Sequence, residues 1–151
     1  MSNPVSLEAG PEPWFTADHR RCDDLWAAVE GPAGGDDALG AAQAFAAFDK
    51  AMRRHLDMEE QVLFPAFESA TGMVRGPTMV MRAEHDQMRG LLDQMAMALS
   101  DQDLGGLLDN GDTLLMVIQQ HNVKEEGMLY PMMQMHLLHQ WSQLTPKLSR
   151  Y

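Results

Sequence analysis

The feature that most constrains this chain is a motif that it contains twice. Residues 55–65 (HLDMEEQVLFP) and residues 121–131 (HNVKEEGMLYP) both read His-x-x-x-Glu-Glu-x-x-Leu-aromatic-Pro. The copies are 66 residues apart (121 − 55), and His19 and His85 repeat at the same offset (85 − 19). Packing preserves apolar character, but it gives no reason to repeat histidine and glutamate at matched points. The sequence therefore indicates a duplicated unit whose matched polar residues share a function.

The apolar residues follow the spacing of helices rather than that of strands. Helical stripes cover four segments, and strict alternation of apolar and polar residues is rare. Aspartates in the loops at residues 31–37 and 100–103 suit helix N-caps. Pro65 and Pro131 fall inside helical patterns, and each should kink its helix or end its regular part. The helices are expected at about residues 16–30, 38–69, 77–99 and 104–132.

Four amphipathic helices with short loops predict an all-α fold, an antiparallel, up-down-up-down four-helix bundle. The bundle is expected to span residues 14–140. Residues 1–13 contain three prolines and little periodicity, which indicates an extended N-terminal arm, and residues 141–151 are expected to form a C-terminal tail. The amphipathic stretch at residues 133–141 is compatible with a homodimer.

Composition argues against several classes of protein. A formal net charge of −11 disfavours nucleic acid and anionic membrane surfaces as partners. The chain has no apolar run of about 18 residues that would span a membrane, and its N-terminus lacks the features of a secretory signal. A single cysteine, Cys22, excludes an internal disulfide framework and suits a reducing compartment. We therefore expect a cytoplasmic protein.

The repeated histidines and glutamates lie on apolar stripes, which predicts that they are buried. Residues four apart in a helix differ by about 40° in direction, so each His-x-x-x-Glu pair points the same way. Packing the four inner faces together brings four imidazoles and two carboxylates to one level of the core. Burying one unpaired carboxylate costs several kcal/mol, and a pair of cations would compensate for it. The candidate metal ligands are His19, His55, Glu59, His85, His121 and Glu125.

The ligand types narrow the choice of metal. Nitrogen and oxygen ligands without a thiolate argue against a cysteine-rich zinc site, and calcium or magnesium would require oxygen. Mixed imidazole and carboxylate suits iron or manganese, and zinc stays open. Two bridging glutamates and two histidines per ion give each ion four protein ligands. One or two positions are then left for an oxo or hydroxo bridge and a small exogenous molecule.

Several neighbours of these residues have alternative roles. Glu60 and Glu126 turn about 140° away from the histidine of their own motif, so a solvated or helix-pairing role is expected. Asp18 and Glu84 could orient imidazoles only through contacts across helices. Arg89 could extend to solvent or pair with an acid near the centre, and the first is expected.

The two motifs, each with its preceding histidine, resemble the hemerythrin-like (HHE) cation-binding domain over about residues 14–135. The resemblance implies a four-helix bundle around a non-haem di-iron centre. It assigns the six candidate residues above as ligands, with both glutamates bridging. Oxygen-carrying hemerythrins have a further histidine where this chain has Arg89, and their last carboxylate falls at Glu126. The set of four histidines and two glutamates is more similar to di-iron proteins that repair iron centres, which usually carry an additional cysteine-bearing domain.

Three functions remain open at this point. A di-iron centre with an open position could bind or sense O2, NO or peroxide, and this is our first expectation. The same centre could act as an enzyme that reduces peroxide or NO, or donates iron to damaged centres, although no separate general acid or nucleophile is evident. A metal, zinc included, could also serve only to clamp the bundle.

Overall fold

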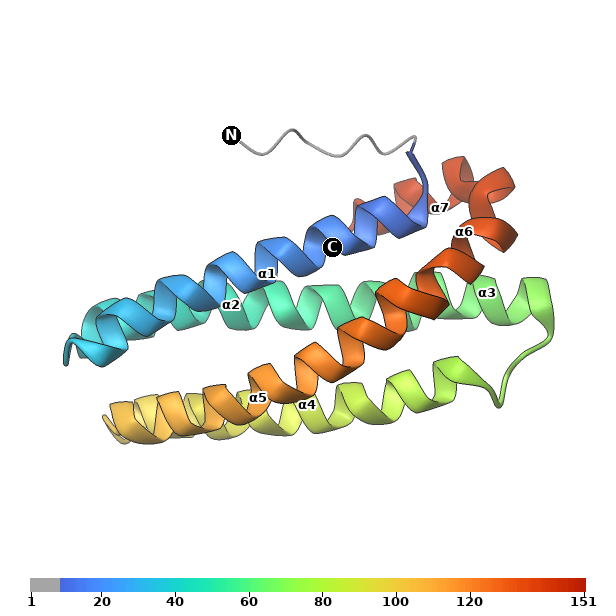
Figure 1. The fold of residues 1–151 in the computed structure, drawn as a ribbon. Helices are drawn as coiled ribbons and strands as arrows, with labels where there is room; N and C mark the ends of the chain where they lie inside the picture. Colours follow the sequence, from blue (N-terminus) through green and yellow to red (C-terminus); the bar gives the residue numbers. More distant parts are fainter. Residues whose placement is uncertain (1–8) are drawn as a thin grey trace.

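The computed structural model describes residues 9–151, and these residues form helices with no strand among them. Figure 1 shows the long helical rods of the fold lying side by side. The all-α fold class is therefore confirmed. No helix in the described part of the chain is long and apolar enough to cross a membrane. The rods are α1 (Pro11–Gly34); α2 (Ala38–Met58), η2 (Glu59–Leu63) and α3 (Phe64–Thr71); α4 (Pro77–Ser100); and α5 (Leu104–Lys124), η3 (Glu125–Leu129) and α6 (Tyr130–Leu137).

Both ends of the helical region extend beyond the predicted limits. Helix α1 begins at Pro11, within the segment expected as an arm, because proline is tolerated in the first turn, where its missing N–H has no intrahelical partner. The rest of the expected arm, residues 1–8, lies outside the described residues. After α6 the chain forms a short 3₁₀ turn, η4 (Leu138–Gln140), and the expected tail, residues 141–151, then begins with α7 (Trp141–Leu148). Helix α7 packs against the bundle because Trp141, Leu144 and Leu148 form a buried stripe.

The connections within the two halves repeat as closely as the histidine motifs do. Asp36 and Gln102 both adopt a left-handed conformation with φ of 57°. The next residues, Asp37 and Asp103, cap α2 and α5, and each accepts a hydrogen bond from the backbone N–H three residues later, at 3.0 and 2.9 Å. These positions again differ by 66, so the duplication includes the loops. The prediction of aspartate caps is confirmed.

The two prolines follow short π-helical turns, η2 and η3. Before Pro65 and before Pro131, the backbone N–H of the preceding residue donates to a carbonyl five residues earlier, in Glu59 and in Glu125. Proline cannot donate to the carbonyl four residues earlier, and its ring would collide with it in a regular helix. The wider turn removes that conflict. Regular α-helix therefore ends before each proline, as predicted, and it ends at the glutamate of the motif.

Two apolar clusters fill the bundle, one on each side of a polar layer. The first includes Trp26, Phe48 and Leu92, and the second includes Phe15, Phe64 and Trp141. Along each rod, the histidine or glutamate of the motif falls between residues of the two clusters. Helix α1 packs along α2, α4 packs along α5, and the two hairpins meet mainly through α1 against α5 and α6. Side chains from both halves therefore converge in the polar layer.

Candidate metal centre

The structure brings all six candidate ligands together in the interior. They come from α1, α2, η2, α4, α5 and η3, and each is at most 4% exposed. The histidine Nε2 atoms face the carboxylates: His55 and His85 lie 3.2 and 3.3 Å from Glu59 Oε1. His19 and His121 lie 3.1 and 3.0 Å from Glu125 Oε1.

Two groups of ligand atoms in this cluster have the size of a cation site. Glu59, His85, His121 and Glu125 each offer an atom within 4.8 Å of the others, and so do His19, His55 and Glu125. Glu125 belongs to both groups. The cluster can therefore surround two neighbouring positions that share a carboxylate.

Four further carboxylates face the outer nitrogen atoms, Nδ1, of the imidazoles. The Nδ1 atoms of His55, His121 and His19 hydrogen-bond to carboxylate oxygens at 2.8 Å, while Nδ1 of His85 lies 3.7 Å from the nearest one. A carboxylate on the outer nitrogen fixes the orientation of a metal-binding imidazole and raises its basicity. The partners of His55, His121, His19 and His85 are Asp18, Glu84, Glu126 and Glu60, in that order.

These contacts bear on three expectations from the sequence and overturn one of them. Glu60 and Glu126 are not solvated, and their predicted helix-pairing role is confirmed, because each faces a histidine of the opposite hairpin. Arg89 does not extend to solvent but pairs with Glu60 and Asp57. Asp18 and Glu84 make the cross-helix contacts that their role requires. The matched offset of 66 residues, which both carboxylate pairs share, was the signal for these roles.

The electrostatics of the cluster favour charged side chains in spite of burial. Burial disfavours the imidazolium of His85, but attraction to Glu59 and Glu60 outweighs this and raises the pKa of His85 to about 9. Burial likewise opposes ionisation of Glu59, yet the neighbouring His55 holds the pKa of Glu59 well below its usual range. Without a cation, His85 therefore retains its proton at neutral pH, and binding of a metal there would release it.

Tyr130 places a hydroxyl among the candidate ligands. Its oxygen lies 2.7 Å from Glu59 Oε2 and 3.1 Å from His19 Nε2. The ring stacks on that of His19, and Phe64, at the equivalent position of the first motif, stacks on His85. The two aromatic residues therefore support equivalent imidazoles, but only Tyr130 adds a polar group.

Buried polar atoms that lack hydrogen-bond partners indicate whether a cation fits this cluster. Among the described residues, Glu59 Oε1, Glu125 Oε2 and His85 Nδ1 are buried without a hydrogen-bond partner. A buried carboxylate oxygen that lacks a partner costs free energy of the order of 1–3 kcal/mol or more. Each glutamate of the motif thus keeps one oxygen that a cation could bind. The donor set of imidazole nitrogens and carboxylate oxygens fits iron, manganese or zinc.

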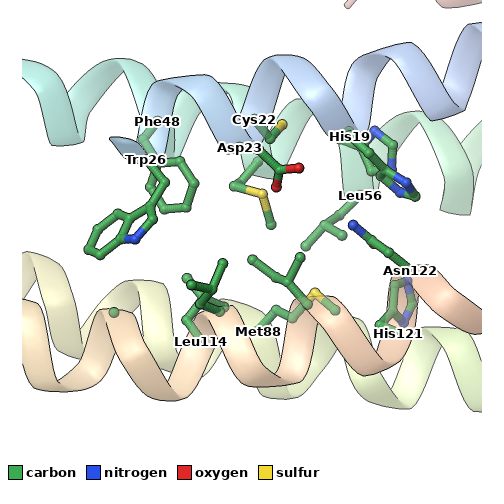
Figure 2. A pocket seen from close by; sticks show the side chains of 15 residues that line it. His19, Cys22, Asp23, Trp26, Phe48, Leu56, Met88, Leu114, His121 and Asn122 are labelled. Atoms are coloured by element: carbon green, nitrogen blue, oxygen red, sulfur yellow. The ribbon is translucent and has the colours of Figure 1, made fainter. Parts of the chain in front are cut away.

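A narrow apolar cavity adjoins the cluster. It has about 20 Å³ of space for the centre of a water-sized molecule, which is room for about one such molecule. Figure 2 shows His19 and His121 at one end and Trp26 and Phe48 at the other, with mostly apolar side chains and the carboxylate of Asp23 between them. The buried Nε1 of Trp26 has no hydrogen-bond partner in residues 9–151. A small, weakly polar molecule is therefore the kind of ligand that this cavity suits.

The remaining histidines and the cysteine lie outside the two groups. His136 and His139 are exposed on α6 and on the following 3₁₀ turn. Cys22 is buried, lines the cavity and belongs to neither group of potential ligands.

Comparison with known proteins agrees with this geometry. The family whose sequence model matches is described as Hemerythrin HHE cation binding domain, and the match covers residues 11–133. No match was found among curated proteins or among solved structures. The matched range contains both motifs, all six candidate ligands and the carboxylates behind them.

Proposed function

Because the chain belongs to the hemerythrin HHE cation-binding domain family, we propose that its buried cluster holds two iron ions and binds or senses a small molecule there. The ligands are His19, His55, Glu59, His85, His121 and Glu125. The small molecule is O2, NO or peroxide.

One observation carries this proposal: the ligand atoms form two groups with a common carboxylate. Glu125 belongs to both groups, and Glu59 faces histidines from both hairpins, His55 and His85. Shared carboxylates are what two neighbouring cations require, because each cation repels the other and the anions between them reduce that repulsion. Manganese or zinc in the same positions are the alternatives to iron.

The fold supports the proposal through its short connections. Residues 35–37, 72–76 and 101–103 join successive rods. Such short links favour rods that alternate in direction, the antiparallel arrangement expected of this bundle. Alternation brings the two motifs to one level from opposite hairpins.

The cavity supports binding of a small molecule. When bound, iron supplies an open coordination position and a change of oxidation state. The protein supplies apolar walls, here Cys22, Met52 and Met88, that favour O2 or NO over bulk water. The space beside His19 and His121 admits only a very small ligand.

Metal analysis tests the proposal directly. We expect about two iron ions per chain, by mass spectrometry, in protein produced with iron supplied. His121→Ala should lose most of this iron, and His139→Ala, which alters an exposed histidine, should retain it. Anaerobically reduced protein should develop a charge-transfer absorption band on exposure to O2 or NO. Protein with no bound metal, or iron retained in full by His121→Ala, would contradict the proposal.

A second candidate is an enzyme that reduces peroxide or NO with an external electron donor. Tyr130 favours it, because its buried hydroxyl contacts Glu59 and His19 and can exchange a proton with a ligand at the centre. The test is sustained consumption of peroxide or NO in the presence of a donor. A single stoichiometric event in the iron-loaded protein would favour binding or sensing instead.

A further inference from the structure

Each of the four carboxylates that face the imidazoles also contacts a positively charged side chain. Glu126 shows the usual arrangement, in which one oxygen serves each partner. Its Oε2 lies 2.8 Å from His19 Nδ1, and its Oε1 accepts a 2.7 Å hydrogen bond from Arg20. In Glu84, likewise, one oxygen contacts His121 and the other contacts Lys124. In Asp18, one oxygen contacts His55, and the other faces Arg21 and Arg54.

Glu60 is the exception. Arg89 donates to both of its oxygens, to Oε1 at 3.2 Å and to Oε2 by a still shorter contact. A further Arg89 hydrogen bond of 2.9 Å reaches Asp57. His85 Nδ1 is left 3.7 Å from Glu60 and has no hydrogen-bond partner among the described residues. The arginine fork therefore holds Glu60 away from the imidazole that the repeat assigns to it.

The sequence explains this difference between the hairpins. The first hairpin has Arg20 and Asp23 after its histidine, and the second has Asp86 and Arg89 at the matched positions. The order of acid and base is thus reversed. Arg89 comes four residues after His85, so it lies on the same side of the helix as that histidine. It is 24% exposed, whereas Arg20, one residue after His19, is 60% exposed.

We propose that Arg89 makes the two cation positions unequal by withholding Glu60 from His85. Arg89 is a positioning residue that acts through Glu60. The position bounded by His85 and His121 binds its cation more weakly and releases it first. The position bounded by His19 and His55, where both imidazoles are held by carboxylates, retains its cation longer. This inference rests on the proposed two-metal centre.

The size of the effect follows from the role of such carboxylates. Loss of the hydrogen-bond partner of a metal-binding imidazole lowers metal affinity by about 10- to 100-fold. Titration of the metal-free protein with Zn²⁺ against a competing chelator should therefore show two steps separated by about that factor. The same difference should appear as two rates when excess chelator removes zinc from the loaded protein.

Substitution of the arginine tests the cause. Arg89→Met frees Glu60 to accept a hydrogen bond from His85 Nδ1, so the zinc affinity of the weaker step should rise by about 10-fold or more. The difference in affinity between the two steps should then narrow. Arg20→Met is the matched control. Because Glu126 keeps its own contact with His19 in this variant, the zinc affinities of both steps should be unchanged. Arg89→Lys keeps the charge but not the fork. If the lysine variant retained the full separation, the fork would not be its cause.

A second pair of variants keeps the test independent of folding effects at Arg89. Glu60→Gln should change the affinity of the weaker step by no more than about two-fold, since His85 Nδ1 has no hydrogen bond to Glu60 that could be lost. Glu126→Gln should lower the affinity of the stronger step by about 10-fold. Equal losses in the two variants would overturn the inference. Two zinc ions bound with equal affinity by the wild type would also overturn it and leave the proposed function intact. Fewer than two bound ions would instead refute the two-metal centre.

Discussion

The Tyr130 hydroxyl donates a 2.7 Å hydrogen bond to Oε2 of Glu59, which precedes it by 71 residues. Both groups are fully buried, and they belong to different hairpins. At the position of Tyr130 in the first hairpin, the chain has Phe64, which cannot make this bond. The hydrogen bond therefore joins the two halves at the centre of the polar layer, and it does so on one side only.

Tyr130→Phe should destabilise the metal-free protein. The substitution keeps the ring that stacks on His19 but leaves Glu59 Oε2 without its donor. Hydrogen bonds to charged groups contribute about 1.5–3 kcal/mol, so the free energy of unfolding should fall by about that amount. Chemical denaturation measures this change. Tyr151→Phe, which removes an exposed hydroxyl, is the matched control and should cost less than about 0.5 kcal/mol. Equal effects of the two changes would contradict the role given to Tyr130.

Gly111→Ala should destabilise the bundle because Trp26 occupies the space next to Gly111. A Cβ atom at this position would collide with the indole ring at Cη2, and the buried ring cannot move aside freely. Overpacking of this kind costs about 1–3 kcal/mol. Gly90→Ala is the control: it lies inside α4, nothing surrounds its added carbon, and the change should stabilise by about 0.5–1 kcal/mol. Denaturation curves of the two variants should thus shift in opposite directions.

Cys22 should react slowly with alkylating reagents in the native protein. Burial raises the pKa of its thiol from 9.0 to about 11, and only the thiolate is nucleophilic. At pH 8 the thiolate fraction is lower by about 100-fold than for an ordinary cysteine, and alkylation should accelerate as the pH rises toward 11. Mass spectrometry after iodoacetamide treatment measures the rate, with denatured protein as the reference. Equal rates at pH 8 in native and denatured protein would show that the thiol is accessible and ionised.

Metal should stabilise the fold as well as occupy the centre. A ligand present at about 1,000 times its dissociation constant stabilises the native state by about 4 kcal/mol, which corresponds to a rise in Tm on the order of 10 °C for a chain of this size. Melting curves with Fe²⁺ under anaerobic conditions, and with chelator, measure the difference. His121→Ala should lose most of the rise. An unchanged Tm after metal removal would mean that the polar layer does not need a cation.

Helix content and the buried polar layer could be predicted because both depend on local spacing. The stripes of apolar residues predicted four helical rods. The spacing of four residues within each motif predicted that its histidine and glutamate face the interior together. The ends of the helical region could not be located this way. Pro11 reads as a breaker in sequence but starts a helix, and the stripe formed by Trp141 and Leu148 is too short to distinguish from a tail.

Contacts between the hairpins were harder to predict. Glu60 and Glu126 point away from the histidines of their own motif, as their position in the helix requires, yet each faces a histidine of the other hairpin. Local geometry cannot show this, because it depends on which helices become neighbours. The contact of Arg89 departs from the expectation for the same reason, because its partner Glu60 is 29 residues away in another rod. For the two glutamates the repeat offset was a better guide than the helical angle, but it could not predict the contact of Arg89, whose matched position holds Asp23.

The connection at residues 72–76 separates two units that each supply three of the six inward-facing side chains. If the backbone were cut there, neither fragment could enclose a cation alone. Capture of the metal would then require the two fragments to associate first, so it would depend on the concentration of the fragments. The continuous chain makes that encounter intramolecular.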